Sequence, residues 1–360
     1  MCKGLRKVAS DSYSPKFSDA NSSSIESANW QKDYLPQCVT TEIELGQDPD
    51  KEGPVSAYLT HYLGNNRHLA DVDPRPAILY LHGLNDYFFQ TDLAHFLDRE
   101  GYSFYALDLR KCGRAQKPGQ SPHMVSDLAF YDQELNAALR IIQQRGHSKW
   151  FGMAHSTGGL ILPLWVDRMH GNPRWQKPSG LIMNSPWWDL TQSDVVRSPL
   201  GSIVLKTLGS IFPWTDIPGQ EDDTYGRTLH VTRDGEWNYR TEWKRIDSVP
   251  KKFGWFWSIR SSQLKLHKGL DLGIPMLVLS SDRSGADSEN PTRDHTADVV
   301  LNIDDMARWA PAVTSINEVH QIPNARHDVF LSIPPAREQA YKTLKKWLYD
   351  QEHSTYWERG

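Results

Sequence analysis

The stretch WFGMAHSTGGLILPLWV, residues 150–166, decides the fold. Apolar residues run to Ala154 and resume at Leu160, and the segment HSTGG stands between them. A short apolar run, a cluster of small and polar residues and a longer apolar segment predict a strand, a tight turn and a helix. The fold class depends on whether this unit recurs along the chain.

Strands and helices alternate on both sides of this stretch. Continuous apolar runs predict strands buried on both faces at 76–82 and 102–108, and further strands are predicted at 148–154, 180–185, 275–281 and 315–322. Apolar residues at helical spacing predict helices at 90–101, 126–145, 158–169, 303–310 and 335–350. Residues 40–45 and 56–64 alternate like antiparallel edge strands. The pattern predicts an α/β fold with a mostly parallel central sheet and helices on both faces.

The alternation stops at Pro186 and resumes only near residue 275. Residues 186–260 are rich in Gly and Pro and contain seven of the 14 tryptophans of the chain. We therefore expect a cap insertion over 186–260 in a single core that spans 31–185 and 261–360. Residues 1–30 hold eight serines and few large apolar groups, which predicts a flexible N-terminal tail.

Composition narrows the class of protein. The chain of 360 residues is 39% hydrophobic and has a net charge of −4, so nothing indicates a nucleic-acid partner. No apolar run approaches the roughly 18 residues that span a bilayer, and the N-terminus lacks the apolar stretch of a secretory signal. Three widely spaced cysteines predict reduced thiols and a cytoplasmic protein. The cysteines and histidines of the sequence do not cluster at the spacing of metal ligands, so no metal site is predicted.

Ser156 is the candidate nucleophile. An alkyl hydroxyl needs a base within hydrogen-bond reach, an acid that orients the base, and amide donors for the oxyanion. Residues 154–158 read A-H-S-T-G and match the nucleophile elbow G-x-S-x-G except at Ala154. Small residues on both sides of the serine allow the tight turn to pack. The alternative is an ordinary loop serine, and the partners elsewhere in the chain favour the nucleophile.

The oxyanion donors are expected after the strand at 76–82. The segment LYLHGLNDY, residues 79–87, places His-Gly directly after a buried strand, which suits a loop whose backbone amides face a substrate. The amides of Leu84 and Thr157 are the predicted donors. The alternative is a simple turn that ends the strand.

His327 is the candidate base. It lies in NARHDVFLS, after the last predicted strand and before the final helix, where the chain order Ser, Asp, His places the base. The chain has 14 histidines, and we expect His82 and His155 to shape the oxyanion loop and the elbow instead. His320 lies within a predicted strand.

The acid should follow the strand at 275–281. Asp298 begins DVVLNIDDMARWA, in which an apolar pair and then a helix follow the aspartate, and this arrangement favours it. Asp282 ends the strand directly and is the alternative acid, and Asp287 lies between them. Each of the three could instead be a turn or helix-capping residue.

These segments together resemble the serine α/β-hydrolase superfamily, and within it the monoacylglycerol lipase, lysophospholipase and serine aminopeptidase (S33)-like group. The resemblance rests on LYLHGLNDY, LDLRKCGRA (107–115), AHSTGG and NARHDVFLS and covers roughly residues 40–350. The group's elbow reads G-H-S-M-G-G, so AHSTGG departs from it at two positions. The group's acid lies in G-x-x-D-x-[IV], and HTADVV matches the second half.

The resemblance implies an α/β-hydrolase fold with a cap over the site, and it implies no metal or organic cofactor. Aromatic side chains in the cap could line an acyl pocket, and VPKKFGWFWSIR (249–260) is expected to contribute Trp255 and Trp257. The alternative is that these tryptophans fill the cap's own core.

The leading hypothesis is a serine hydrolase that cleaves a small-molecule carboxylic ester through an acyl-enzyme on Ser156. We expect the protein to have no membrane-spanning segment, and transient contact with lipid is compatible with an acyl ester substrate. The alternatives are an aminopeptidase-like amide hydrolase, for which Glu221, Asp222 and Asp223 could bind an amine, and an acyltransferase. A non-catalytic binding protein of this fold is the remaining reading. An aspartate-nucleophile hydrolase is disfavoured because the elbow carries serine.

Overall fold

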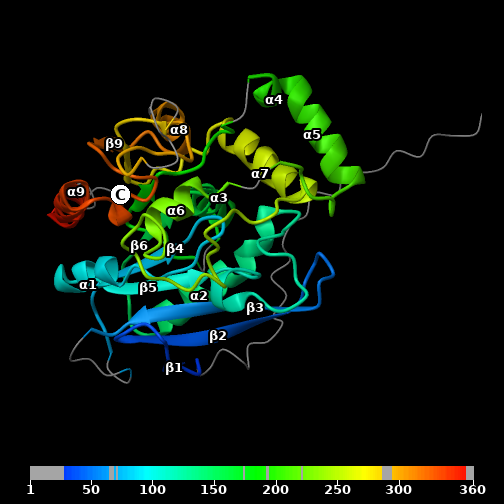
Figure 1. Cartoon of the computed structure of the whole chain (residues 1–360). Coiled ribbons are helices and arrows are strands. Elements are labelled where there is room, and N and C mark those ends of the chain that lie inside the picture. The colour runs from blue at the N-terminus through cyan, green and yellow to red at the C-terminus, as the bar shows by residue number, and fades with distance from the viewer. Residues whose placement is uncertain are drawn as a thin grey trace, which may run out of the picture.

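A nine-stranded sheet forms the centre of the computed structural model, which describes residues 28–64, 69, 72–172, 175–191, 194–219, 222–285 and 294–353. The strands are β1 (Gln31–Lys32), β2 (Cys38–Gln47), β3 (Pro54–Tyr62), β4 (Ala77–Leu81), β5 (Ser103–Asp108), β6 (Trp150–His155), β7 (Leu181–Asn184), β8 (Met276–Ser281) and β9 (Asn317–Ile322). Their order is β1-β2-β3-β5-β4-β6-β7-β8-β9. Figure 1 shows β1 and β2 at one edge of the sheet and β9 at the other.

The sheet is antiparallel at its N-terminal edge and parallel elsewhere. The pairs β1–β2, β2–β3 and β3–β5 are antiparallel, and every pair from β5 to β9 is parallel. The prediction of a mostly parallel sheet with an antiparallel edge is therefore confirmed. The strand β1 was not predicted, because its two residues are polar and exposed.

The helices outside residues 186–275 follow the predicted alternation, and four more α-helices lie in the described part of that interval. They are α1 (Thr91–Arg99), α2 (Asp132–Gln144), α3 (Gly158–Met169), α4 (Asp194–Arg197), α5 (Pro199–Ile211), α6 (Thr224–Leu229), α7 (Phe253–Leu266), α8 (Ile303–Val313) and α9 (Pro334–His353). Short 3₁₀ helices span Gly113–Ala115, Leu128–Tyr131 and Val329–Leu331. Among the described residues, no helix has both the length and the apolar character needed to cross a membrane.

Each face of the sheet has its own apolar core. Successive residues of a strand point to opposite faces, so Leu79 of β4 belongs to the core that includes residues of α2, α3, α7 and α8, while Tyr80 belongs to the core that includes residues of α1 and α9. Both residues are at most 1% exposed. The helices on the two faces hold the parallel strands in register, and the loops at the carboxyl ends of those strands meet at one edge.

The predicted insertion, residues 186–260, contains α4, α5, α6 and the first part of α7. The boundary expected at residue 260 falls inside α7, which runs unbroken from Phe253 to Leu266. Helix α5 lies on the outer side of α7, away from the sheet (Figure 1).

The predicted tail, residues 1–30, lies outside the described residues except for 28–30. Ala28 and Trp30 pack against the core, and the ring of Trp30 lies 6.1 Å from that of His61. Ordered structure therefore begins before residue 31, because Trp30 supplies a large apolar surface that a tail of small polar residues lacks.

Candidate active site

Ser156 lies on a tight turn between β6 and α3. Its backbone φ of 52° falls in the left-handed region, which residues other than glycine seldom adopt. Its amide donates a 3.0 Å hydrogen bond to the carbonyl oxygen of Asn184. Gly158 permits the turn, since a Cβ there would lie 2.6 Å from the carbonyl oxygen of His82. The backbone geometry is that of a nucleophile elbow, and it presents a serine that is 7% exposed.

The loop after β4 passes close to this serine. A Cβ placed on Gly83 would lie 3.0 Å from Ser156 Cβ. Within the part of the chain that the structure describes, the amides of Leu84 and Thr157 donate no hydrogen bond to protein acceptors. Backbone amides at a packed site are normally paired, so two unpaired amides beside a serine suit an oxyanion.

His82 holds the loop in place. One ring nitrogen, Nδ1, lies 2.7 Å from the carbonyl oxygen of Gly83, to which it donates, and the other accepts a 3.1 Å hydrogen bond from the amide of Leu109. Both nitrogens are thereby engaged. The structure thus gives His82 the shaping role that the sequence suggested.

His327 and Asp298 are paired. Nδ1 of His327 lies 2.9 Å from Oδ2 of Asp298, and the two residues are 2% and 0% exposed. The other carboxylate oxygen, Oδ1, accepts hydrogen bonds from the amides of Val300 and Leu301 at 2.9 and 2.8 Å. The carboxylate of Asp298 is therefore held on both sides, and its hydrogen bond fixes the orientation of the imidazole, which is the arrangement that a catalytic histidine needs.

The alternative acid Asp282 does not reach His327. It is exposed, and it accepts a 3.0 Å hydrogen bond from the amide of Asn324 instead. Its place directly after β8 leaves it at the rim of the sheet, where it caps the turn after β9. Asp287 lies outside the described residues.

His327 faces the elbow. Its ring centroid lies 4.8 Å from that of His155, the residue before the serine, and 5.3 Å from that of Tyr225 in α6. Asp328 fixes the loop that carries it, because Oδ1 and Oδ2 of Asp328 accept hydrogen bonds from Asn184 and Gln90 at 2.7 and 3.2 Å. No local pattern in the sequence indicated these contacts, since Asn184, Gln90 and Asp328 lie far apart along the chain.

A buried ion pair adjoins the site. Lys244 Nζ lies 3.0 Å from Oδ1 of Asp86, and Nδ1 of His155 lies 3.4 Å from its Oδ2. Burial alone would raise the pKa of the Asp86 carboxyl, but Lys244 and His155 hold it well below its usual range. Asp86 is therefore charged at neutral pH, and its charge is compensated from the insertion.

A small pocket adjoins the unpaired amides. Leu84 and Thr157 line it together with Trp255, Cys112 and His123. Burial raises the pKa of the Cys112 thiol and lowers that of His123 to about 3, so both are neutral. Although Sγ of Cys112 lies 3.1 Å from Nδ1 of His123, the pair is not poised as a second nucleophile and base.

The structure brings Trp255, but not Trp257, to this pocket. The two residues lie about 200° apart around α7 at 3.6 residues per turn. Trp257 instead packs at Gly209 of α5, where a Cβ on the glycine would lie 2.6 Å from Trp257 Cβ. Of the two tryptophans expected to bind substrate, these contacts favour Trp255 over Trp257.

Among the described residues, no group of three or more His, Cys, Asp and Glu side chains is arranged to hold a metal ion. The sheet order, the elbow after β6, the paired acid and base after β8 and β9, and the loop after β4 define an α/β-hydrolase fold.

The family follows from comparison with known proteins. The model of the serine aminopeptidase family, S33, matches residues 72–331, and the chain belongs to this family. No curated protein sequence matches the chain.

Solved structures share the fold at low sequence identity. A soluble variant of monoglyceride lipase from Saccharomyces cerevisiae, in complex with a substrate analog, is 16% identical, with a TM-score of 0.60 over 91% of this chain and 98% of that one. Monoacylglycerol lipase from Paleococcus ferrophilus is 17% identical, with a TM-score of 0.57 over 77% and 96%. A thermostable carboxyl esterase from Bacillus coagulans, in complex with glycerol, is 13% identical, with a TM-score of 0.58 over 86% and 98%.

Proposed function

We propose that this protein is a serine hydrolase that cleaves a carboxylic ester through an acyl-enzyme on Ser156. One observation carries the proposal: the ring of the buried, Asp298-paired His327 lies 4.8 Å from that of His155, directly before a serine that is held in a left-handed turn beside two unpaired amides. A nucleophile, a base, an orienting acid and oxyanion donors are the parts that acyl transfer needs.

In the proposed mechanism, Nε2 of His327 takes the proton of Ser156 as Oγ attacks the ester carbonyl carbon. The amides of Leu84 and Thr157 donate to the oxyanion of the tetrahedral intermediate. The imidazolium then protonates the leaving alcohol, and the acyl group stays on the serine. Water, deprotonated by His327, attacks the acyl carbon, and the imidazolium returns its proton to Ser156 Oγ as the acyl–oxygen bond breaks and the carboxylic acid is released. Asp298 keeps the proton on Nδ1 so that Nε2 is free to accept.

The choice of an ester rests on the surroundings of the site. The pocket below the amides has an apolar wall that includes Trp255, which suits an acyl chain. Helix α5 in the insertion exposes Leu200, Ile203 and Ile211, which are 70%, 60% and 62% exposed. We propose that residues 186–260 form a cap over the site and that this apolar surface suits contact with lipid. Lipases and an esterase share the fold.

The test is fluorophosphonate labelling of wild type and Ser156→Ala, followed by hydrolysis of p-nitrophenyl esters from C2 to C16. We expect wild type alone to be labelled, and the variant to lose turnover while keeping its melting temperature. An unlabelled wild type, or a Ser156→Ala variant with substantial activity, would contradict the assignment. Labelling without ester hydrolysis would favour an amide substrate or an acyl acceptor other than water.

Peptide hydrolysis is the second candidate, because the family is that of serine aminopeptidases. A substrate amino group needs a carboxylate with free charge, and Asp86 beside the site already has Lys244 as its partner. Of the acidic residues expected to bind an amine, Glu221 lies outside the described residues and Asp222 is exposed. Turnover of aminoacyl-naphthylamides without turnover of acyl esters would favour the peptidase.

A further inference from the structure

The loop that offers the Leu84 amide is tied to the insertion by the residue that follows it. The side chain of Asn85 accepts a 2.9 Å hydrogen bond from the amide of Arg245 and donates one of 2.9 Å to the carbonyl oxygen of the same residue. Asn85 also donates to the carbonyl oxygen of Asp247 at 3.4 Å. One amide side chain thereby pairs with the backbone of a segment 160 residues away in the sequence.

The next residue adds an ion pair to the same segment. Asp86 and Lys244 are 1% and 4% exposed, and Nζ of Lys244 lies 5.4 Å from the ring centroid of Tyr225. A buried cation with a carboxylate and an aromatic face around it has few other positions open to it. We call residues 240–247, which supply Lys244, the cap turn.

Tyr87 extends the connection to the other end of the cap turn. Its hydroxyl oxygen accepts hydrogen bonds from the amide of Arg240 at 2.9 Å and from the hydroxyl of Tyr34 at 2.7 Å. The guanidinium of Arg240 lies 4.3 Å from the ring centroid of Tyr34. The cap turn is thus held against both the loop and the N-terminal segment.

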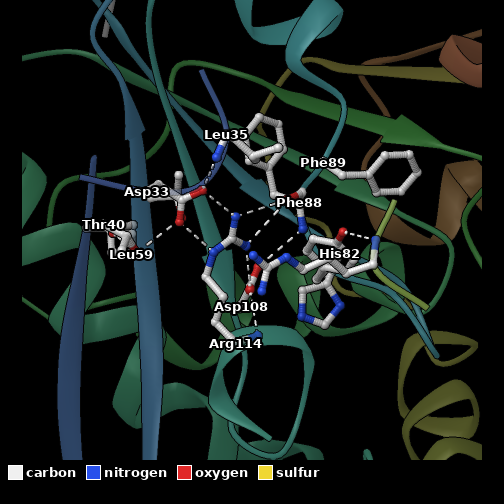
Figure 2. A network of polar contacts seen from close by, with 12 residues as sticks. Asp33, Leu35, Thr40, Leu59, His82, Phe88, Phe89, Asp108 and Arg114 are labelled. Atoms are coloured by element: carbon white, nitrogen blue, oxygen red, sulfur yellow. Dashed lines mark hydrogen bonds and ion pairs between the residues drawn. The ribbon is translucent and has the colours of Figure 1, made fainter. Parts of the chain in front are cut away.

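Phe88 anchors the far side of the loop, as Figure 2 shows. Its amide donates to Asp108 at 3.2 Å, and its carbonyl oxygen lies 3.4 Å from each terminal nitrogen of Arg114. Arg114 is paired with both Asp108 and Asp33, each at 2.8 Å. This network fixes the loop at Phe88, whereas the cap turn fixes it from Asn85 to Tyr87.

We propose that the cap turn positions the Leu84 amide in the oxyanion hole and that Asn85 is the positioning residue. The inference rests on the proposed function. Asn85 has a φ of 52°, and its side chain is bonded to the cap turn on both its oxygen and its nitrogen, so the chain is held directly after Leu84. On the other side of Leu84, a Cβ on Gly83 would lie 3.0 Å from Ser156 Cβ, so the Gly83–Leu84 peptide that carries the amide lies between two held points. The direction of the Leu84 N–H therefore depends on the insertion as well as on β4.

This coupling predicts which step suffers when the pairing is lost. An oxyanion donor acts on the transition state more than on the bound ester, so its displacement lowers kcat and leaves KM nearly unchanged. Removal of such a donor costs about 100- to 1,000-fold in kcat. Since the amide would be loosened rather than removed, we expect a loss of about 10- to 100-fold.

The experiment compares Asn85→Gly and Asn85→Asp with Arg227→Gln in the full chain. Glycine accepts the left-handed backbone without the amide, and aspartate keeps the acceptor for Arg245 while losing the donor. Arg227 pairs with Asp234 on the exposed side of the insertion, away from the loop, so it controls for general loosening. The readouts are kcat and KM on a p-nitrophenyl ester, inhibition by a trifluoromethyl ketone, and melting temperature.

We expect Asn85→Gly to lose kcat about 10- to 100-fold with KM within about threefold, and Asn85→Asp to lose less. The adduct of the trifluoromethyl ketone carries an oxyanion, so the affinity of the enzyme for this inhibitor should fall by the same factor as kcat/KM. Arg227→Gln should keep wild-type kcat. If Asn85→Gly fails to fold, the kcat of Asn85→Asp is compared with that of wild type, and an unchanged kcat contradicts the proposal.

An Asn85→Gly variant with full kcat, or one that loses no more than Arg227→Gln, would show that the pairing only holds the insertion in place. In that case wild type still loses turnover on Ser156→Ala, so the proposed function stands. If wild type hydrolyses no ester and is not labelled, the proposed function and this inference are both overturned.

Discussion

Asp298 uses its two carboxylate oxygens for different purposes. Oδ2 lies 2.9 Å from His327, and Oδ1 accepts the amides of Val300 and Leu301. The backbone bonds fix the carboxylate without using the oxygen that faces the imidazole. An asparagine with its carbonyl oxygen toward the amides would keep those bonds and present an NH₂ group to the histidine.

We therefore predict that Asp298→Asn folds like wild type and loses kcat by roughly 10³- to 10⁴-fold, because the imidazole is held in the wrong tautomer. Asp282→Asn is the matched control and should stay within about threefold of wild type. The measurement is steady-state hydrolysis of a p-nitrophenyl ester. Equal losses in the two variants would contradict the assignment of the acid.

The sequence indicated Ser156 and His327 because each follows a predicted strand in the required chain order. It favoured Asp298 over Asp282 only from the apolar pair and helix that follow Asp298, because the geometry of the acid depends on how the loop after β8 returns. In the structure, Gly285 and Asp298 are joined by a 2.6 Å backbone hydrogen bond, and a bridge pairs Ser284 with Asp298. These contacts bring a residue far along the loop back to the end of the strand.

Gly158 is the second decisive residue of the elbow. A Cβ there would lie 2.6 and 2.7 Å from the carbonyl oxygens of His82 and Leu81. We predict that Gly158→Ala lowers the free energy of unfolding by about 1–3 kcal/mol and lowers activity, because the elbow must move away from the loop. The measurement is urea unfolding alongside ester hydrolysis.

Ala154→Gly is the contrasting variant, since it supplies the glycine that the elbow pattern has at this position. It should cost only about 0.5–1 kcal/mol, as expected for glycine within a strand, and should keep activity. If Gly158→Ala is no less stable than Ala154→Gly, the backbone at Leu81 and His82 can move away from the added Cβ at little cost in free energy.

At the scale of the element, helix α7 has two aromatic faces with different surroundings. Trp255 is 4% exposed and lines the pocket, whereas Trp257 packs at Gly209 of α5. The sequence pattern did not separate them, since both residues are large, apolar and close together. The helix also crosses the boundary expected at residue 260, because residues along its whole length pack in the core while Phe253 and Trp257 pack against α5 at Gly209.

We predict that Trp255→Leu shifts the optimum of the p-nitrophenyl ester series toward longer acyl chains, because the smaller side chain widens the pocket. Trp257→Leu should lower the melting temperature and leave the chain-length profile unchanged. If both variants shift the profile equally, α7 affects the pocket through its overall position and not through Trp255.

At the scale of the whole molecule, the alternation of apolar runs predicted the sheet and most of its helices, because strands buried on both faces must be apolar throughout. The ion pairs between distant segments were not predictable. Asp33 and Arg114 lie 81 residues apart, and nothing in either local sequence indicates the other. Such contacts depend on the three-dimensional arrangement that the apolar pattern produces.

Buried histidines give the whole molecule a pH dependence. Burial lowers the pKa of His61 to about 3. The imidazole is stacked on the ring of Tyr105, with 4.1 Å between the ring centroids. Between about pH 6.5 and pH 3 the unfolded chain binds a proton at this residue and the folded chain does not. His61 therefore does not lower the free energy of unfolding above about pH 6.5. On acidification from there toward pH 3, the free energy of unfolding falls by about 1.4 kcal/mol per pH unit because of this residue.

We predict that His61→Phe, which keeps an aromatic ring on Tyr105, loses less stability than wild type between pH 7 and pH 5. The measurement is urea unfolding at each pH. Comparison of the two proteins at pH 8, where the imidazole is neutral in both states, corrects for the lost hydrogen bond to Phe104. Parallel pH profiles for the two proteins would show that His61 does not contribute to the acid sensitivity.

The strands β7 and β8 are neighbours in the sheet, but residues 185–275 separate them in the sequence. At about 5–20 residues per second, a ribosome needs roughly 5–20 s to cross that interval. During that time a nascent chain already carries the serine turn and an apolar strand with an open edge, and it lacks both acid and base. Open edges invite pairing with other chains. We therefore expect a nascent chain halted within this interval to be more prone to association than one that has completed β8.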